Sequence, residues 1–169
     1  RSPRTAGLSS YLTNFARFPV WKNTSVSYHS LGEQQYADML IELEKAKKFI
    51  FLEYFIIDRG EMWDTILGIL SKKAEEGVDV RIIYDDMGCL RKIPSNYYKK
   101  LEKLGIKCLV FNPFIPIISL VMNNRDHRKI MVIDGNTVFT GGINLADEYI
   151  NHKIRFGHWK DTGVMLKGD

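Results

Sequence analysis

The chain has 169 residues, of which 45% are hydrophobic and 26% are charged. This length suits one domain with its own hydrophobic core, and the composition excludes an intrinsically disordered chain. The net charge of +4 favours an anionic partner such as phosphate, a lipid headgroup or nucleic acid, and no run approaches the ~20 apolar residues that a membrane-spanning helix needs.

Helical and strand patterns alternate through the first two thirds of the chain. Residues 1–24 show no sustained period, so we expect an irregular lead-in there. Apolar residues at helical spacing predict helices over 34–47, 62–76 and 95–104, and apolar runs predict strands over 49–57, 78–84 and 106–111. The strand at 49–57 is expected to be buried on both faces. This alternation predicts a single α/β domain over residues 25–169 with a largely parallel sheet.

The last third has a different character. A long loop is expected over 112–126, and its apolar run at 115–122 either contacts an acyl layer or is buried in the core. Strands are expected over 128–133 and 137–140, followed by a short helix capped by Asn144 and a final strand over 159–166. Cys89 and Cys108 are too few for a disulfide framework, so we expect free thiols.

Six residues near the end of the chain form the pattern H-x-K-x4-D-x6-G-G-x-N: His127, Lys129, Asp134, Gly141, Gly142 and Asn144. Residues two apart on a strand share a face, so His127 and Lys129 are expected to project together. A neutral imidazole can attack phosphorus while a neighbouring ammonium holds a non-bridging phosphate oxygen. The pattern therefore indicates phosphodiester chemistry.

The remaining motif residues are expected to support that chemistry. Gly142 lets a phosphate approach the backbone closely, and Asn144 can offer its side-chain amide at a helix N-terminus, which favours an anion. Asp134 ends the strand that follows His127. It either orients a neighbouring polar group or is only a turn residue.

This pattern resembles the signature of the phospholipase D superfamily, and the resemblance to bacterial cardiolipin synthases runs from about Phe18 to the last residue. It is carried by residues 51–57, 77–81, 84–88, 111–113, 123–129, 141–149 and 159–163. The resemblance implies a phospholipase D-like fold, a mixed β-sheet flanked by helices. It also implies a reaction without metal or cofactor that proceeds through a phosphohistidine.

The implied reaction transfers a phosphatidyl group between two phosphatidylglycerols and yields cardiolipin and glycerol. The resemblance assigns catalysis to His127, Lys129 and Asp134, and phosphate binding to Lys129, Gly142 and Asn144. Anionic phospholipid is the expected partner. The parent protein is expected at the bacterial cell membrane, with the present residues forming a soluble fragment.

Enzymes of this kind carry two such motifs on two similar halves, whereas none of His29, His152 and His158 begins a second complete motif here. We therefore expect one catalytic half of a longer two-motif protein, inactive as a monomer. The missing histidine would come from a C-terminal half or from a second copy in a homodimer.

Two other functions remain open. One is a phospholipase D or nuclease-like phosphodiesterase that acts as a dimer, and the other is a non-catalytic domain that binds anionic lipid. The second would need Lys129 and Asn144 but not His127. Nucleic acid is not expected, because the aromatic residues lie mostly inside predicted strands and helices and not along a basic stripe.

Several charged residues outside the motif are candidates for supporting roles. Glu53 is the only charge in its apolar strand, where an unpaired carboxylate is unfavourable. It either stands behind the site or belongs to a buried ion pair. Arg125 is either an accessory phosphate contact behind the motif or a surface cation. Asp85 and Asp86 end a strand at the edge where α/β sites lie, or are solvated loop acids.

Overall fold

The computed structural model describes residues 3–114, 123–155 and 157–168. Its α-helices are α1 (Pro3–Asn14), α2 (Gly32–Lys45), α3 (Glu61–Glu75) and α4 (Tyr97–Lys103), with a 3-10 helix η1 (Asp147–Ile150). Its strands are β1 (Ser25–His29), β2 (Phe49–Tyr54), β3 (Asp79–Asp85), β4 (Lys107–Phe111), β5 (Lys129–Ile133), β6 (Thr137–Gly141) and β7 (Gly163–Lys167).

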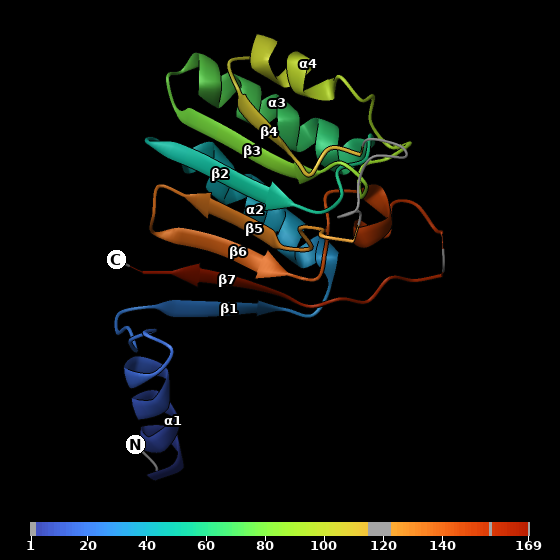
Figure 1. The fold of residues 1–169 in the computed structure, drawn as a ribbon. Coiled ribbons are helices and arrows are strands. Elements are labelled where there is room, and N and C mark those ends of the chain that lie inside the picture. The colour runs from blue at the N-terminus through green and yellow to red at the C-terminus, as the bar shows by residue number, and fades with distance from the viewer. Residues whose placement is uncertain (1–2, 115–122, 156, 169) are drawn as a thin grey trace.

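The strands form one mixed sheet in the order β1-β7-β6-β5-β2-β3-β4 (Figure 1). The expected α/β class is confirmed, but the sheet is less parallel than predicted. Among the described strands only the β2–β3 and β3–β4 pairs are parallel. Helical crossovers build that half, whereas β5 and β6 are joined by a tight turn in which Asp134 and Gly135 have φ of 53° and 82°. Such a turn imposes antiparallel pairing.

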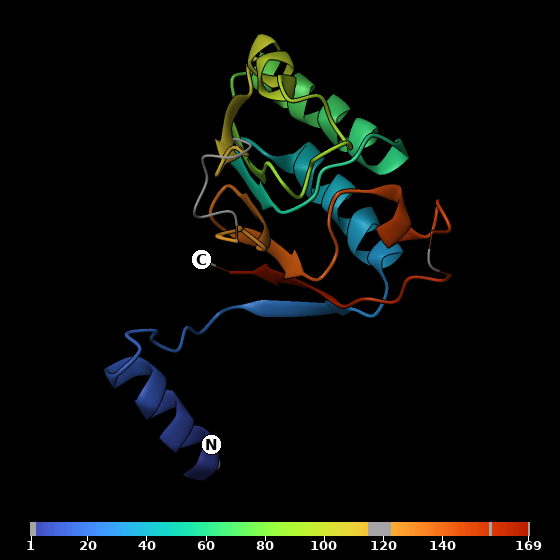
Figure 2. The ribbon, with the colours of Figure 1, turned by 45° about the vertical axis from the view of Figure 1, so that its right-hand side comes forward.

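Helices α2 and α3 pack against one face of the sheet (Figures 1 and 2). In β2 the side chains of Ile50, Leu52 and Tyr54 are buried beneath them, whereas the alternate residues Phe49 and Phe51 are only half-buried. The prediction that this strand is buried on both faces was therefore wrong. In the described part of the chain, no helix covers the second face (Figure 2).

The N-terminal residues differ from the prediction. The expected irregular lead-in contains α1, a helix without a single buried residue, which projects from the body of the molecule in both ribbon views. Strand β1 was also missed, although Ser25, Val26, Ser27 and Tyr28 alternate polar and apolar residues as an edge strand does. It pairs antiparallel with β7.

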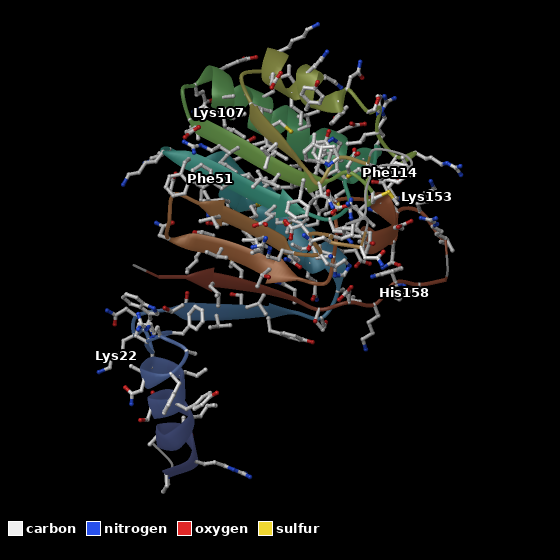
Figure 3. The ribbon with its side chains drawn as sticks, in the orientation of Figure 1. Lys22, Phe51, Lys107, Phe114, Lys153 and His158 are labelled. Atoms are coloured by element: carbon white, nitrogen blue, oxygen red, sulfur yellow. The ribbon has the colours of Figure 1, made fainter. Side chains whose placement is uncertain are left out.

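Sheet topology brings several chain segments to one end of the molecule. The parallel strands β2, β3 and β4 end at the same edge, and antiparallel β5 begins there because Lys129 lies opposite Tyr54. Side chains crowd this end of the sheet, between the labelled Phe114 and His158 (Figure 3). The apolar run at 115–122 lies outside the described residues. None of the helices in the described ranges is long and apolar enough to cross a membrane.

The core contains a buried hydrogen bond that can be tested. Trp63 on α3 is fully buried, and its Nε1 donates to the hydroxyl of Tyr97 at 2.7 Å. Tyr97→Phe leaves that indole N–H without an acceptor, so we expect the free energy of unfolding in urea to fall by about 1–3 kcal/mol. Tyr28→Phe, at a tyrosine that is 65% exposed, should leave it unchanged. Equal stability of both variants would show that the bond contributes nothing.

Candidate active site at the carboxyl edge of the parallel strands

His127 and Lys129 meet around the ring of Phe55. Lys129 is buried, and its Nζ donates to the carbonyl oxygen of His127 at 2.6 Å. The exposed imidazole of His127 packs edge-on against Phe55 with ring centroids 4.8 Å apart, and Lys129 Nζ lies 5.3 Å from the centroid of the same ring. The two motif side chains thus share one location, with the imidazole open to solvent and the ammonium behind it.

The Lys129 ammonium is poorly compensated. Burial lowers its pKa below the ordinary value, and the more distant charges of Asp126 and Asp161 offset this only in part. Within the described residues no carboxylate forms an ion pair with it. A buried ammonium whose protein contacts are a carbonyl and an aromatic ring favours the arrival of an anion.

A buried carboxylate holds the chain just before His127. Asp85 is fully buried and accepts the backbone N–H groups of Asp126 at 3.0 Å and Gly88 at 2.9 Å. Arg125 donates to Asp85 at 3.3 Å and to the carbonyl of Asn112 at 3.1 Å. Arg125 therefore ties this segment to Asp85 and Asn112 and is not a surface cation. Asp85 is buried and is not a solvated loop acid.

Glu53 lies beside the motif on the uncovered face of the sheet. Arg128 pairs with Glu53 at 2.8 Å and with Asp126 at 2.9 Å, so Glu53 has the basic partner that one of its two predicted alternatives required. A hydrogen bond with Asp126 and burial raise the pKa of Glu53 to about 7. Burial also favours the neutral form of Asp126, but its bonds to Glu53 and Arg128 outweigh this and hold its pKa low. When the two carboxyl groups share a proton, these shifts favour its position on Glu53 over Asp126.

Asp134 does not belong to this site. It follows the far end of β5, about 16 Å from Lys129 for five residues of strand, and it accepts the backbone N–H groups of Lys47, Lys48 and Phe49 at 2.9, 2.7 and 3.0 Å. Burial favours its neutral form, but these three donors prevail and lower its pKa. This placement favours the alternative in which Asp134 is a structural residue, because it anchors the start of β2, and its catalytic role stays a prediction.

The two motif glycines are required by a close approach of the chain entering β7. A Cβ on Gly142 would collide with the carboxylate of Asp161, and Gly141, with φ of 152°, faces the carbonyl of Thr162. The backbone amide of Gly142 donates to that carbonyl at 3.0 Å. The space over Gly142 is thus occupied by Asp161, a carboxylate, and phosphate binding there remains a prediction.

Asn144 is buried and ties two elements together. Its Oδ1 accepts the Ile56 N–H at 3.0 Å, and its Nδ2 donates to the Tyr149 hydroxyl at 2.9 Å. The predicted helix cap was wrong, because η1 begins after Ala146 without a side-chain cap. In this arrangement Asn144 fixes the exit of β2, next to Phe55, and its contact with phosphate stays a prediction.

Sequence reasoning missed Phe55 and Asp161. Phe55 was interpreted only as an apolar strand residue, although both His127 and Lys129 lie against its ring. Asp161 accepts a hydrogen bond from Trp159 Nε1 at 3.3 Å, lies over Gly142 and offsets part of the lowering of the Lys129 pKa that burial causes. The exposed His158 lies at the same end of the molecule (Figure 3) and is followed by Lys160, but Met165 replaces the motif aspartate.

Neither cysteine forms a disulfide, as expected, since both Cys89 and Cys108 are free. Among the residues that the structure describes, no group of three or more His, Cys, Asp and Glu side chains is arranged to hold a metal ion.

A family model and several known proteins match this chain over most of its length. The family described as "Cardiolipin synthase, PLD-like domain" matches residues 39–154, more than half of the chain. Cardiolipin synthase 2 of Staphylococcus epidermidis is 40% identical over 94% of this chain and 32% of its own length. An uncharacterized protein of Streptococcus mutans is 55% identical over 98% of this chain and 36% of its own length. The chain thus spans about a third of these relatives.

Solved structures share this fold. A phospholipase D family member, Nuc from Salmonella typhimurium, superposes with a TM-score of 0.61 at 19% identity, over 86% of this chain and 82% of its own.

Asp134→Asn separates the structural role from a catalytic one. It weakens an acceptor of three backbone N–H groups, so the free energy of unfolding should fall by about 1–3 kcal/mol in urea. The contribution is present at neutral pH and is lost as pH falls through the lowered pKa of Asp134. Glu44→Gln, an exposed acid paired with Lys72, is the control and should change little. Unchanged stability with lost activity would support the catalytic assignment.

Glu53→Gln tests the shared proton. A carboxyl group whose folded pKa is raised contributes stability fully below its unfolded pKa of 4.5, and this is lost as pH rises to about 7. Glutamine does not titrate, so the stability of the variant relative to the parent chain should increase between those pH values. Thermal unfolding across that range measures it. A difference that is constant with pH would contradict the assignment of the proton to Glu53.

Proposed function

The chain belongs to the cardiolipin synthase family of phospholipase D-like domains, and on that premise we propose that it supplies one catalytic half of a phosphatidyltransferase. The observation that carries this proposal is the pairing of an exposed imidazole with a buried ammonium that forms no ion pair within the described residues, both around Phe55. Such a pair offers a nucleophile to phosphorus and a positive charge to the phosphate oxygens.

In the first step a nitrogen of His127 attacks the phosphorus of phosphatidylglycerol, and the bond from phosphorus to the glycerol headgroup breaks. The phosphatidyl group is then held on His127 as a phosphohistidine. Lys129 binds a non-bridging oxygen, whose negative charge increases as attack proceeds. Since Lys129 is 6% exposed, its field is screened less by water than that of a surface lysine.

In the second step the hydroxyl of another phosphatidylglycerol attacks phosphorus, the bond from phosphorus to the His127 nitrogen breaks, and cardiolipin forms with His127 free again. The departing glycerol needs a proton and the incoming hydroxyl must lose one, which requires a second acid–base group on the opposite side of phosphorus. We assign that role to a second motif, supplied by another part of a longer polypeptide or by a second copy of this chain. Asp85, Arg125 and Asp161 hold the first motif in place.

A substrate with a better leaving group isolates the step that this chain performs. In a p-nitrophenyl ester of phosphatidic acid the leaving group is p-nitrophenolate, which departs without being protonated. A missing general acid is then no longer limiting. We expect the chain to release a burst of about one p-nitrophenolate per His127 and to retain an acid-labile, base-stable phosphoryl label.

His127→Ala should abolish both the burst and the label, and Lys129→Ala should slow the burst about 10²–10³-fold. His158→Ala, at another exposed histidine of the same end, is the matched control and should behave as the parent chain. No burst from the parent chain, or an undiminished burst from His127→Ala, would contradict the proposed function and favour a domain that only binds lipid.

A further inference from the structure

We propose that helix α1 and the segment after it, residues 3–22, dock in the plane of an anionic lipid surface. The apolar side chains of α1 lie at the spacing of a single helical face: Leu8, Tyr11, Leu12 and Phe15, which we call the α1 stripe. The remaining positions are filled mostly by Ser, Thr, Asn and Gly. Phe15 N–H donates to the Tyr11 carbonyl at 3.0 Å, so it continues the last turn.

The α1 stripe lies outside the protein core. Leu8 and Tyr11 are 60% and 59% exposed, and Phe15 is 78% exposed. The segment after the helix adds Phe18 and Trp21, exposed at 72% and 75%. Isolated helices of this length are marginal in water unless an apolar face is packed. A helix of 12 residues with none buried therefore needs an apolar surface from elsewhere.

The charge of the chain identifies that surface. Residues 1–32 hold four basic residues, Arg1, Arg4, Arg17 and Lys22, and no acidic one. Subtracting these four from the 24 Lys and Arg leaves 20, which equals the 20 Asp and Glu of the chain. Residues 33–169 are thus formally neutral, and the whole net charge of +4 belongs to the segment that carries the exposed apolar residues.

Basic residues around an apolar stripe with exposed Tyr and Trp match a bilayer interface with anionic headgroups. An acidic protein groove would also attract the charges. However, a bilayer interface suits a mixed row of aromatic and aliphatic side chains without demanding a matching shape. Lys22 lies where the segment joins the body of the molecule (Figure 3), so docking would hold the domain at the lipid surface. This inference is independent of the chemistry assigned to His127.

Vesicle flotation tests the docking. The chain should bind phosphatidylcholine vesicles that contain phosphatidylglycerol, bind pure phosphatidylcholine vesicles much less, and release from the anionic vesicles at high salt. Leu12→Gln/Phe15→Gln should weaken binding at least about tenfold because it removes apolar area that enters the interface. Arg17→Gln/Lys22→Gln should weaken binding to the anionic vesicles on the order of 25-fold, about fivefold per charge.

Ser9→Gln/Thr13→Gln alters the polar side of the same helix and is the matched control, which should bind as the parent chain does. Two results would overturn the inference. One is vesicle binding that survives in Leu12→Gln/Phe15→Gln but is lost in Lys129→Ala, which would place the lipid contact at the active site. The other is a dimer of the parent chain in ultracentrifugation that the stripe variant dissociates, since a second copy would then cover the stripe.

Discussion

The antiparallel pairing of β5 with β2 is the constraint on which the site depends. It places Lys129 opposite Tyr54, at the edge where the parallel strands end, and it places Asp134 at the other edge, over the start of β2. Phe55, the residue that follows β2, is thereby brought under both His127 and Lys129. A change of register would separate the two motif side chains from their common ring. The bonds of Asp134 to the first residues of β2 hold that register.

The same pairing explains why some residues of the motif lie at the candidate site and others stabilise the sheet. Its histidine and lysine lie at the end of the sheet where the parallel strands finish, with His127 exposed and Lys129 buried. Its aspartate and asparagine saturate backbone and side-chain partners and fix the strands from both ends. Residues close together in a sequence pattern therefore need not be adjacent in the site, because the five residues from Lys129 to Asp134 span the length of β5, about 16 Å.

Sequence periodicity predicted most of the helices and strands from 34 onward, because each has an apolar face at the proper spacing. It overestimated the parallel part of the sheet, since β5 and β6 form a hairpin and β7 and β1 then extend the sheet by antiparallel pairing. The lead-in was missed because α1 has no core-facing side, so its stripe did not stand out as a buried face. In the site, His127 and Lys129 lie against the same ring, that of Phe55, and their roles in catalysis stay predictions. The role of Phe55 depends on pairing across strands, which no local pattern of residues contains.

The ammonium of Lys129 gives the most direct test of the account. Its signal in ¹³Cε-lysine NMR should titrate with a pKa below the ordinary value of 10.5, because burial disfavours the charged form. Adding inorganic phosphate or glycerol phosphate should raise that pKa, because a neighbouring anion favours the ammonium. An ordinary pKa that does not respond to either anion would contradict the claim that the site holds a buried cation awaiting a phosphate.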